Sequence, residues 1–204
     1  LPHTDILVVT DFRTGLLERC WPAQHQIKWV HATSAGVDAL LFPALIDSDL
    51  LLTNARGVFD LGIAEYVLGA VLLFAKDTLG NLRHQQAQQW QHRETELIKG
   101  KRALIIGAGS IGGEVARLLV ANETLDEELP HADFVIITAP LTPATEQLIN
   151  AKRLALMPKH AVLINVGRGA VVVSDDLVSA LKSGELAGAA LDVVDPEPLP
   201  EGHP

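Results

Sequence analysis

The sequence predicts an α/β protein built on a doubly wound parallel sheet, and three features support this class. Short apolar runs such as Phe134 to Ile137 contain no alternating polar residues, which is typical of strands buried on both faces. Segments with apolar residues at helical spacing separate these runs. A glycine-rich turn directly follows one run, at residues 107–112. A second, smaller α/β domain is expected to precede this sheet.

The second part of the chain, from about residue 100, alternates strands and helices regularly. We expect strands at 103–106, 134–137, 161–166 and 189–194, and helices at 111–121, 151–157 and 174–182. Pro158 would end the second of these helices. Ser174 is expected to cap the third, which has two acidic residues in its first turn and Gly184 after its end.

The first part of the chain repeats this pattern less regularly. Strands are expected at 6–9, 27–30 and 50–53, with a short helix at 16–20. One long apolar helix is expected at 61–79, where Gly62 and Gly69 favour close packing by another element, and a polar arm at 85–91. The boundary between the two domains is placed at the start of the long helix, which gives residues 1–60 and 61–204.

The chain of 204 residues is acidic, with 25 Asp and Glu against 16 Lys and Arg and a formal net charge of −9. Because like charges repel, this balance argues against a nucleic acid or an anionic membrane surface as the main partner. No apolar run reaches the roughly 18–20 residues that span a bilayer. Cys20, the single cysteine, excludes a disulfide framework and favours a reducing, cytoplasmic location. We expect both ends to be cut, because the chain starts on an apolar run and stops in a Pro-rich turn.

The turn at residues 107–112 fits the pattern G-x-G-x-x-G, which binds dinucleotides in Rossmann-like folds when it follows a strand and opens a helix, as here. Gly107 would allow the tight turn, Gly109 would let the backbone approach a pyrophosphate, and Gly112 would let the helix pack closely on the strand. The helix N-terminus would add free N–H groups and a positive dipole end. The alternative is a strand–helix turn without a ligand.

The acidic residue that usually holds the adenosine ribose is missing from its expected place. It should end a second strand about 20 residues after the turn, but the chain runs from Asn122 directly into Glu123 and an acidic segment. Either the nucleotide fold is unusual or a segment is absent at this point, and we favour the absence. Asp126, Glu127 and Glu128 are therefore expected on a solvated helix face rather than at a ribose.

Three further segments share one property, since each follows a predicted strand. They are Thr138 to Thr142, Asn165 to Gly169 and Asp192 to Pro198. The carboxyl ends of parallel strands lie along one edge of a sheet, and ligands bind in the crevice outside that edge. We therefore expect the glycine turn, Arg168, Asp192 and Glu197 to converge there.

Arg168 and Glu197 carry the chemistry expected at this edge. The guanidinium of Arg168 presents a rigid fork of donors, which suits a carboxylate with an adjacent carbonyl; the alternative is a surface arginine in a turn. Glu197 could orient an imidazole and favour its protonated form, or it could be an ordinary acidic loop residue.

A candidate anion site also follows an early strand. Successive N–H groups at Ala35 and Gly36 could bind a substrate carboxylate as a backbone nest. Taken alone, the residues favour a plainer interpretation, in which Ser34 caps the start of a helix.

These segments together resemble the D-isomer-specific 2-hydroxyacid dehydrogenase family. The matching stretches are 31–38, 53–58, 63–76, 107–112, 139–142, 163–169 and 187–193, which together cover nearly the whole chain, and the run from Arg168 to Pro198 is highly specific. The resemblance implies a flavodoxin-like α/β substrate domain at residues 1–60 beside a Rossmann-like dinucleotide-binding domain at 61–204. It also implies an NAD(P)-dependent oxidoreductase that interconverts small 2-keto acids, such as glyoxylate or hydroxypyruvate, and D-2-hydroxy acids.

The resemblance implies roles for the matching residues. Arg168 and Glu197 would be catalytic, Arg168 by binding the substrate and Glu197 as the partner of the catalytic acid. Ala35 and Gly36 would hold the substrate carboxylate together with Arg168. The implied cofactor-binding residues, for NAD or NADP, are Gly107, Gly109, Ser110, Ile111, Gly112, Ala139, Pro140, Val166, Gly167, Arg168 and Asp192. No metal site is expected.

The resemblance also implies features outside this sequence. The family's catalytic histidine stands in a Pro-His motif downstream of Glu197, and His203 comes too early to be that residue. A C-terminal return to the substrate domain would follow as well. Family members are usually homodimers, so the region of the helix at 61–79 is the expected interface. The alternative function is a non-catalytic NAD(H)-sensing scaffold, similar to corepressors with this fold.

Overall fold

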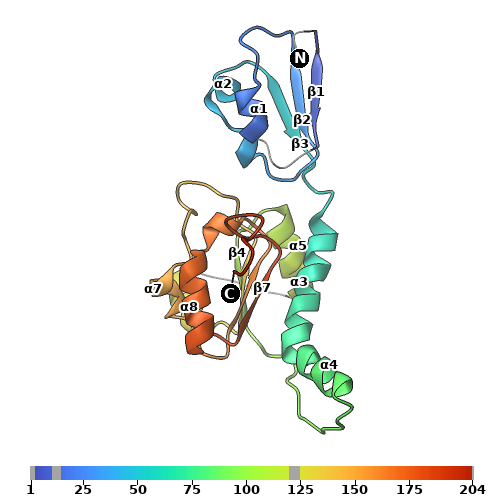
Figure 1. The fold of residues 1–204 in the computed structure, drawn as a ribbon, viewed down its shortest axis with the longest axis vertical. Helices are drawn as coiled ribbons and strands as arrows, with labels where there is room; N and C mark the ends of the chain where they lie inside the picture. Colours follow the sequence, from blue (N-terminus) through green and yellow to red (C-terminus); the bar gives the residue numbers. More distant parts are fainter. Residues whose placement is uncertain (1–2, 11–14, 120–124, 204) are drawn as a thin grey trace. The chain divides into compact units, whose positions relative to one another are not determined.

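The computed structural model describes residues 3–10, 15–119 and 125–203, and the chain divides into two compact units, Leu1–Asp60 and Leu61–Pro204 (Figure 1). Each unit has its own parallel sheet. The segment expected to be absent near residues 122–123 lies outside the described residues. Among the helices that are described, none is long and apolar enough to cross a membrane.

The first unit contains a three-stranded parallel sheet with helices against one face. The strands pair in the order β1-β2-β3, where β1 is Ile6–Val9, β2 is Trp29–Ala32 and β3 is Leu51–Asn54. The helices are α1 (Gly15–Arg19), the 3-10 helix η1 (Asp38–Leu40) and α2 (Pro43–Ile46). Val30 and Ala32 are buried in an apolar cluster with Leu40, Phe42 and Leu45. Strand β2 begins two residues later than expected, because Ile27 packs into this cluster before the ladder starts.

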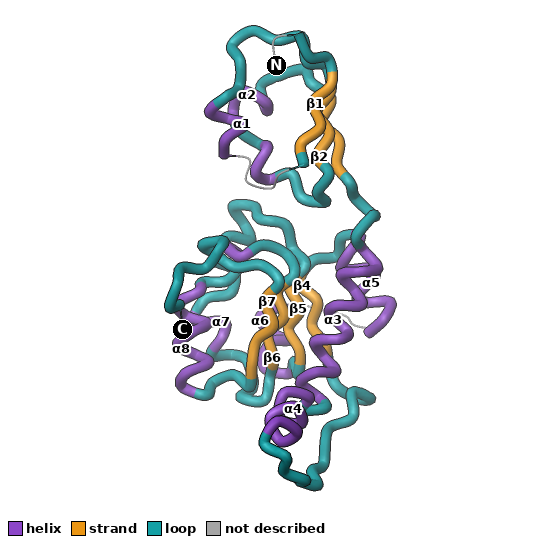
Figure 2. Tube along the Cα trace, turned by 45° about the vertical axis from the view of Figure 1, so that its right-hand side comes forward, coloured by secondary structure: helices purple, strands orange, loops and turns teal. Residues whose placement is uncertain are grey.

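The second unit contains a four-stranded parallel sheet in the order β4-β5-β6-β7. The strands are β4 (Ala103–Ile106), β5 (Phe134–Ile137), β6 (Val162–Asn165) and β7 (Gly188–Leu191). Every residue of β5 and β6 is buried. Helices cover both faces, with α3 and α5 on one side and α7 and α8 on the other (Figures 1 and 2). The doubly wound α/β class predicted from the sequence is confirmed.

Two apolar clusters hold these layers together. Val67 of α3 (Asp60–Ala75) and Val115 of α5 (Ser110–Leu119) are buried against one face of the sheet. Leu154 of α7 (Ala151–Leu154) and Leu177 of α8 (Ser174–Ser183) are buried against the other face, together with residues around α6 (Leu125–Glu128) and the 3-10 helix η2 (Leu129–His131). A second 3-10 turn, η3 (Gly169–Val171), follows β6.

The single helix expected at 61–79 is wrong, because the chain forms two helices there. Helix α3 ends at Ala75, and α4 runs from Thr78 to Gln86. Asp77 between them has a left-handed φ of 44°, and its carboxylate accepts a hydrogen bond from the Gly80 N–H at 3.1 Å, so it caps the second helix. A Cβ at Gly62 or Gly69 would meet no atom within 4 Å, so no described element of this chain packs closely there.

The expected cap of α8 is also wrong. Val173 occupies the cap position, whereas the Ser174 hydroxyl donates to the Asp195 carbonyl at 2.7 Å. Ser174 therefore connects the start of α8 to the loop after β7, a partner that is remote in sequence. Gly184 ends the helix in the left-handed conformation, with φ of 71°, as expected.

Candidate functional site

The carboxyl ends of the four strands in the second unit lie in register. Ile106, Ile137, Asn165 and Leu191 are partners across the sheet, and each is the last residue of its strand. The loops that follow therefore leave the same edge, as the parallel arrangement predicts (Figure 2). These four loops, together with the first turn of α5, carry the dinucleotide-binding residues expected in this unit.

The glycine turn after β4 has the geometry expected of a phosphate-binding loop. Gly107 has a φ of +115°, a conformation that favours glycine. A Cβ on Gly112 would lie 1.8 Å from the Gly107 carbonyl oxygen, so helix α5 could not approach the turn with any larger residue there. A Cβ on Gly109 would meet nothing within 4 Å. The turn is thus closed where helix meets strand and open at Gly109, the position expected to approach a pyrophosphate, so its residues fit a dinucleotide.

Thr138, the first residue after β5, fastens this turn from the neighbouring strand. Its hydroxyl donates to the Gly107 carbonyl at 2.9 Å, and its N–H donates to the Ile106 carbonyl at 2.9 Å. A Cβ on Gly107 would lie 2.8 Å from both the Thr138 hydroxyl and the Ala139 nitrogen. No role for Thr138 was inferred from the sequence, although a hydroxyl residue directly after a buried apolar strand was the available signal.

The loop after β6 carries Arg168 and is held by hydrogen bonds from Asn165, the last residue of that strand. The Asn165 Oδ1 accepts from the Gly167 N–H at 3.1 Å, and its Nδ2 donates to the Arg168 carbonyl at 3.0 Å. The Arg168 Nη1 donates to the Gly167 carbonyl at 2.9 Å. A Cβ on Gly167 would lie 2.7 Å from the Ala139 carbonyl oxygen, so this loop also packs on the loop after β5.

The loop after β7 packs against the Arg168 loop. The Asp192 N–H donates to the Asn165 carbonyl at 2.9 Å, and a Cβ on Gly169 would lie 2.0 Å from the Val194 carbonyl oxygen. Glu197 lies farther along, exposed, and makes no hydrogen bond or ion pair with any residue the structure describes. The contacts thus bring each loop against its neighbour, and they do not join Glu197 to Arg168.

The remaining predicted cofactor residues lie on the same loops or in the first turn of α5. Ser110 begins α5 and Ile111 packs partly into the apolar cluster beneath it. Ala139 and Val166 are buried at the strand ends, whereas Pro140 is exposed.

The candidate carboxylate loop belongs to the first unit, where it follows β2. The Ser34 hydroxyl donates to the Gly36 carbonyl at 2.7 Å, and the Asn54 Nδ2 donates to the Ala35 carbonyl at 2.5 Å. The Ser-capped helix favoured from the residues alone is therefore wrong, and the first helical turn starts only at Asp38, without a side-chain cap. The N–H groups of Ala35 and Gly36 donate to no residue within the described part of the chain.

A cluster of charges lies at the opposite, amino edge of the second sheet, around Asp133. Its carboxylate accepts from the Arg102 N–H at 2.8 Å, from the His160 Nε2 at 3.0 Å and from the Lys101 Nζ at 3.4 Å. Burial alone would raise the pKa of Asp133, but the Arg102 hydrogen bond, the Lys101 charge and the two side-chain hydrogen bonds outweigh it and lower that pKa. The hydrogen bond to Glu96 raises the pKa of Lys101. This cluster joins the starts of three strands and is remote from the glycine turn.

Asp126, Glu127 and Glu128 lie on the short helix α6, as expected. Asp126 of α6 accepts from the Arg153 Nε at 2.7 Å, and this hydrogen bond lowers the pKa of Asp126. Asp126 is therefore engaged with a cation of the same unit.

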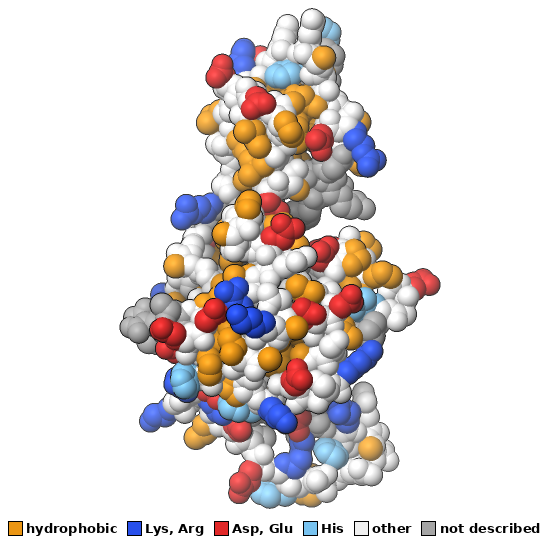
Figure 3. Space-filling view, turned by 90° about the vertical axis from the view of Figure 1, so that its left-hand side faces the viewer, with side chains coloured by type: hydrophobic (Ala, Val, Ile, Leu, Met, Phe, Trp, Pro, Cys, Tyr) orange, Lys and Arg blue, Asp and Glu red, His pale blue; other side chains and the backbone are white. Residues whose placement is uncertain are grey.

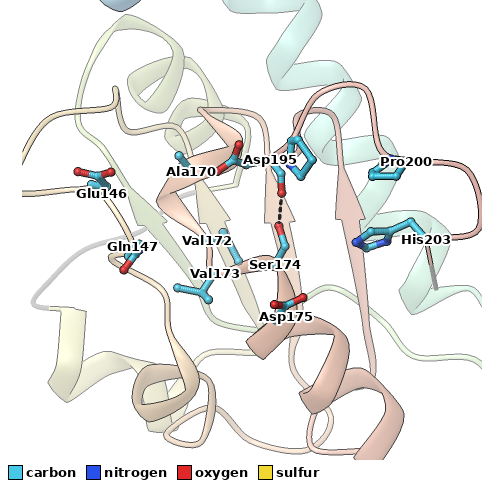
Figure 4. A pocket seen from close by; sticks show the side chains of 11 residues that line it. Glu146, Gln147, Ala170, Val172, Val173, Ser174, Asp175, Asp195, Pro200 and His203 are labelled. Carbon is cyan, nitrogen blue, oxygen red and sulfur yellow. Dashed lines mark hydrogen bonds between the residues drawn. The ribbon is translucent and has the colours of Figure 1, made fainter.

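A separate hollow of about 300 Å³ lies beside the start of α8 (Figure 4). Its lining residues are Glu146, Gln147, Ala170, Val172, Val173, Ser174, Asp175, Asp195, Pro196, Pro200 and His203. None of the predicted site residues is among them. Within the described ranges, no group of three or more His, Cys, Asp or Glu residues is placed to hold a metal ion. On the face that Figure 3 shows, carboxylates and cationic side chains lie interspersed with apolar ones.

Comparison with known proteins identifies relatives along the whole chain. Residues 119–204 match the family model described as "D-isomer specific 2-hydroxyacid dehydrogenase, NAD binding domain". The glyoxylate reductase of Thermofilum pendens is 32% identical over 212 aligned residues, which cover 89% of this chain and 62% of that protein.

Solved structures give the same picture. A D-isomer-specific 2-hydroxyacid dehydrogenase from Xanthobacter autotrophicus, in complex with NADPH, is 31% identical with a TM-score of 0.81, and the match covers 98% of this chain and 70% of that one. An NADPH-dependent glyoxylate/hydroxypyruvate reductase from Sinorhizobium meliloti is 26% identical with a TM-score of 0.85, covering 100% and 72%. The chain thus spans roughly two thirds of the length of these relatives.

Proposed function

This chain belongs to the D-isomer-specific 2-hydroxyacid dehydrogenase family, and we propose that it takes part in the NAD(P)-dependent interconversion of a small 2-keto acid and its D-2-hydroxy acid. The observation that carries the proposal is the edge of the second sheet, where the open glycine turn and the braced Arg168 loop leave strands in register. Glyoxylate and hydroxypyruvate are the first substrates to test, because reductases of these acids are among the relatives.

Residues 61–204 would form the dinucleotide-binding domain. The backbone of the turn from Gly107 to Gly112 would hold the pyrophosphate, with Ser110 and Ile111 at the N-terminus of α5. Val166 and Gly167 would lie under the nicotinamide ribose, and Asp192 would face the nicotinamide amide. When bound, NAD(P)H supplies the hydride or NAD(P)⁺ accepts it.

Residues 1–60 would form the substrate domain. The open N–H groups of Ala35 and Gly36 would bind the substrate carboxylate, and the Arg168 guanidinium would bind the carboxylate and polarise the adjacent carbonyl. Glu197, whose carboxylate is exposed, would orient the imidazole of the general acid and favour its protonated form. Holding the 2-keto acid in a fixed orientation through these contacts would supply much of the rate enhancement.

A homodimer and a cytoplasmic location complete the proposal. Leu61, Tyr66 and Leu72 of α3 are exposed, and the open positions Gly62 and Gly69 lie on the same helix. An apolar helix face with two glycines would let a second copy approach closely. The single cysteine favours a reducing compartment.

Oxidation of NADH and NADPH with glyoxylate, hydroxypyruvate, pyruvate and longer 2-keto acids tests the proposal, on the chain expressed together with the downstream Pro-His motif that the resemblance implies. We expect turnover with at least one acid, and a fall in kcat/KM of roughly 10²–10³-fold in Arg168→Ala, because a charged group that stabilises the reacting carbonyl is removed. Arg117→Ala is the matched control and should behave as wild type, because Arg117 is exposed and paired with Glu114 on the surface of α5.

Binding of NADH, measured separately by fluorescence, distinguishes an inactive enzyme from a protein that does not bind the dinucleotide. A protein that carries the Pro-His motif and binds NADH but turns over no 2-keto acid, or an Arg168→Ala variant with unchanged kcat/KM, would overturn the proposal. The relatives with a stated activity are reductases and dehydrogenases, which favours the enzyme over a dinucleotide-sensing scaffold.

A further inference from the structure

We infer that Asn165 is a positioning residue, which sets the orientation of the Arg168 guanidinium toward the substrate; this inference rests on the proposed function. Asn165 is the last residue of strand β6, and the three residues before it in the strand are all apolar. Among the residues that the structure describes, Asn165 is the only polar or charged residue that is buried, with 1% of its surface exposed. Burial of an amide is costly unless its donor and acceptor are both used, so its partners indicate what it does.

The side chain uses both ends of its amide on the adjacent loop. Oδ1 accepts from the Gly167 N–H, and Nδ2 donates to the Arg168 carbonyl. These two groups belong to the peptide units directly before and directly after the Gly167–Arg168 peptide. The carbonyl of that central peptide accepts the hydrogen bond from the Arg168 Nη1. The guanidinium is thus tied to a peptide unit that Asn165 fixes on both sides.

Neighbouring loops pack closely against both ends of this loop. Gly167 lies against the Ala139 carbonyl on one side, and Gly169 lies against the Val194 carbonyl on the other. The Asn165 carbonyl itself accepts from the Asp192 N–H. Asn165 therefore holds the Arg168 loop at the end of β6 and connects it to Asp192, the residue that follows β7.

The asparagine amide supplies both the acceptor for the Gly167 N–H and the donor to the Arg168 carbonyl. Aspartate is similar in shape and keeps an acceptor for the Gly167 N–H, but it places an oxygen against the Arg168 carbonyl. Leucine keeps the approximate volume and supplies neither a donor nor an acceptor. The two substitutions thus separate the loss of one hydrogen bond from the loss of both.

The test compares Asn165→Asp and Asn165→Leu with Asn150→Asp as the matched control. Asn150 also uses both amide ends on backbone, since it accepts from the Arg153 N–H at 3.3 Å and donates to the Gln147 carbonyl at 3.4 Å. It caps α7 and lies outside the predicted site. The control therefore reports the cost of the same chemical change away from Arg168.

The first readout is amide hydrogen exchange in the dinucleotide-free protein. We expect Asn165→Leu to lose protection at the Gly167 N–H while the amides of β5 and β6 keep theirs, and Asn165→Asp to retain protection at Gly167. The second readout is kinetic. We expect the KM for the 2-keto acid to rise by about tenfold in Asn165→Asp, which is the effect of one lost buried hydrogen bond, and by more in Asn165→Leu, which loses both. The NADH dissociation constant should change less. Asn150→Asp should leave both constants unchanged.

Two results would overturn the inference. One is a loss of protection that spreads evenly over the whole second unit with an unchanged KM, because that is the behaviour of a residue that only stabilises the fold. The other is an unchanged KM together with unchanged exchange at Gly167 in Asn165→Leu. A wild-type protein that turns over no 2-keto acid overturns the proposed function instead. The hydrogen-exchange measurement at Gly167 then still decides whether Asn165 holds the loop.

Discussion

The two sheets of this protein are both parallel and both rich in apolar residues, yet they are buried differently. In the second unit, every residue of β5 and β6 is buried between helices on both faces. In the first unit, Ile6, Val8 and Leu51 are apolar but 51%, 53% and 59% exposed. The described helices of that unit cover the other face. An apolar run therefore predicts a strand without predicting whether both of its faces are covered.

The comparison separates two contributions to a strand. The ladder itself needs only backbone partners in register, and both sheets have these. The free energy gained from burial depends on what covers each face, and here the second sheet gains much more. Predictions about substitutions must therefore start from the exposed fraction of a side chain and not from its hydrophobicity.

Removal of a buried side chain from each sheet gives the largest expected difference. Leu163→Ala, at a position with 0% exposure, should lower the free energy of unfolding by about 2–5 kcal/mol. Leu51→Ala, in a strand of the first sheet, should lower it by less than about 1 kcal/mol. Urea unfolding followed by circular dichroism and by hydrogen exchange for each unit measures both values. Equal losses would show that the exposed face of the first sheet is covered in solution.

Adjacent glycines on α5 offer a sharper contrast within the second unit. Gly112→Ala should destabilise by about 1–3 kcal/mol, because its Cβ would overlap the Gly107 carbonyl oxygen. Gly113→Ala should stabilise by up to about 1 kcal/mol, because its Cβ meets nothing within 4 Å and alanine favours the helix. Thermal unfolding of the two variants checks the difference in sign. Similar melting temperatures would contradict the close contact at Gly112.

Titration of Asp133 should make part of the second unit's stability depend on pH. Its pKa lies below the ordinary value of 3.8 in the folded protein, so folding favours the ionised form. The stability that it contributes is fully present above pH 3.8 and is lost as the pH falls through the lower, folded-state value. At pH 7, Asp133→Asn should cost about 1–2 kcal/mol, and the gap from wild type should close toward pH 2. A gap of constant size between pH 7 and pH 2 would contradict this assignment.

The sequence predicted the strands within a few residues, because a short buried apolar run is a local signal. It also identified the glycine turn, since Gly107 and Gly112 have the conformation and the close contact assigned to them. The continuous helix expected through Asp77 and the caps expected at Ser34 and Ser174 were wrong, because each of these polar side chains has several possible backbone partners. For Ser174, that partner is the carbonyl of Asp195, 21 residues away.

The candidate site divides in the same way. Parallel strands place Arg168 and Asp192 on one edge whatever their sequence separation, so their common location was predictable. The brace formed by Asn165 was not, because its two hydrogen bonds depend on how the following loop turns back over the strand end. A lone amide at the end of an apolar run was the signal, and it becomes informative once burial is known.

One contact between helix and sheet has a consequence for sequence change over evolution. A Cβ on Gly188, at the start of β7, would lie 2.4 Å from the ring of Phe74 on α3. Any enlargement of residue 188 would thus have to be matched by a reduction at residue 74, although 114 positions separate the two. We expect this pair to co-vary between orthologues, with a smaller side chain at residue 74 where residue 188 carries one.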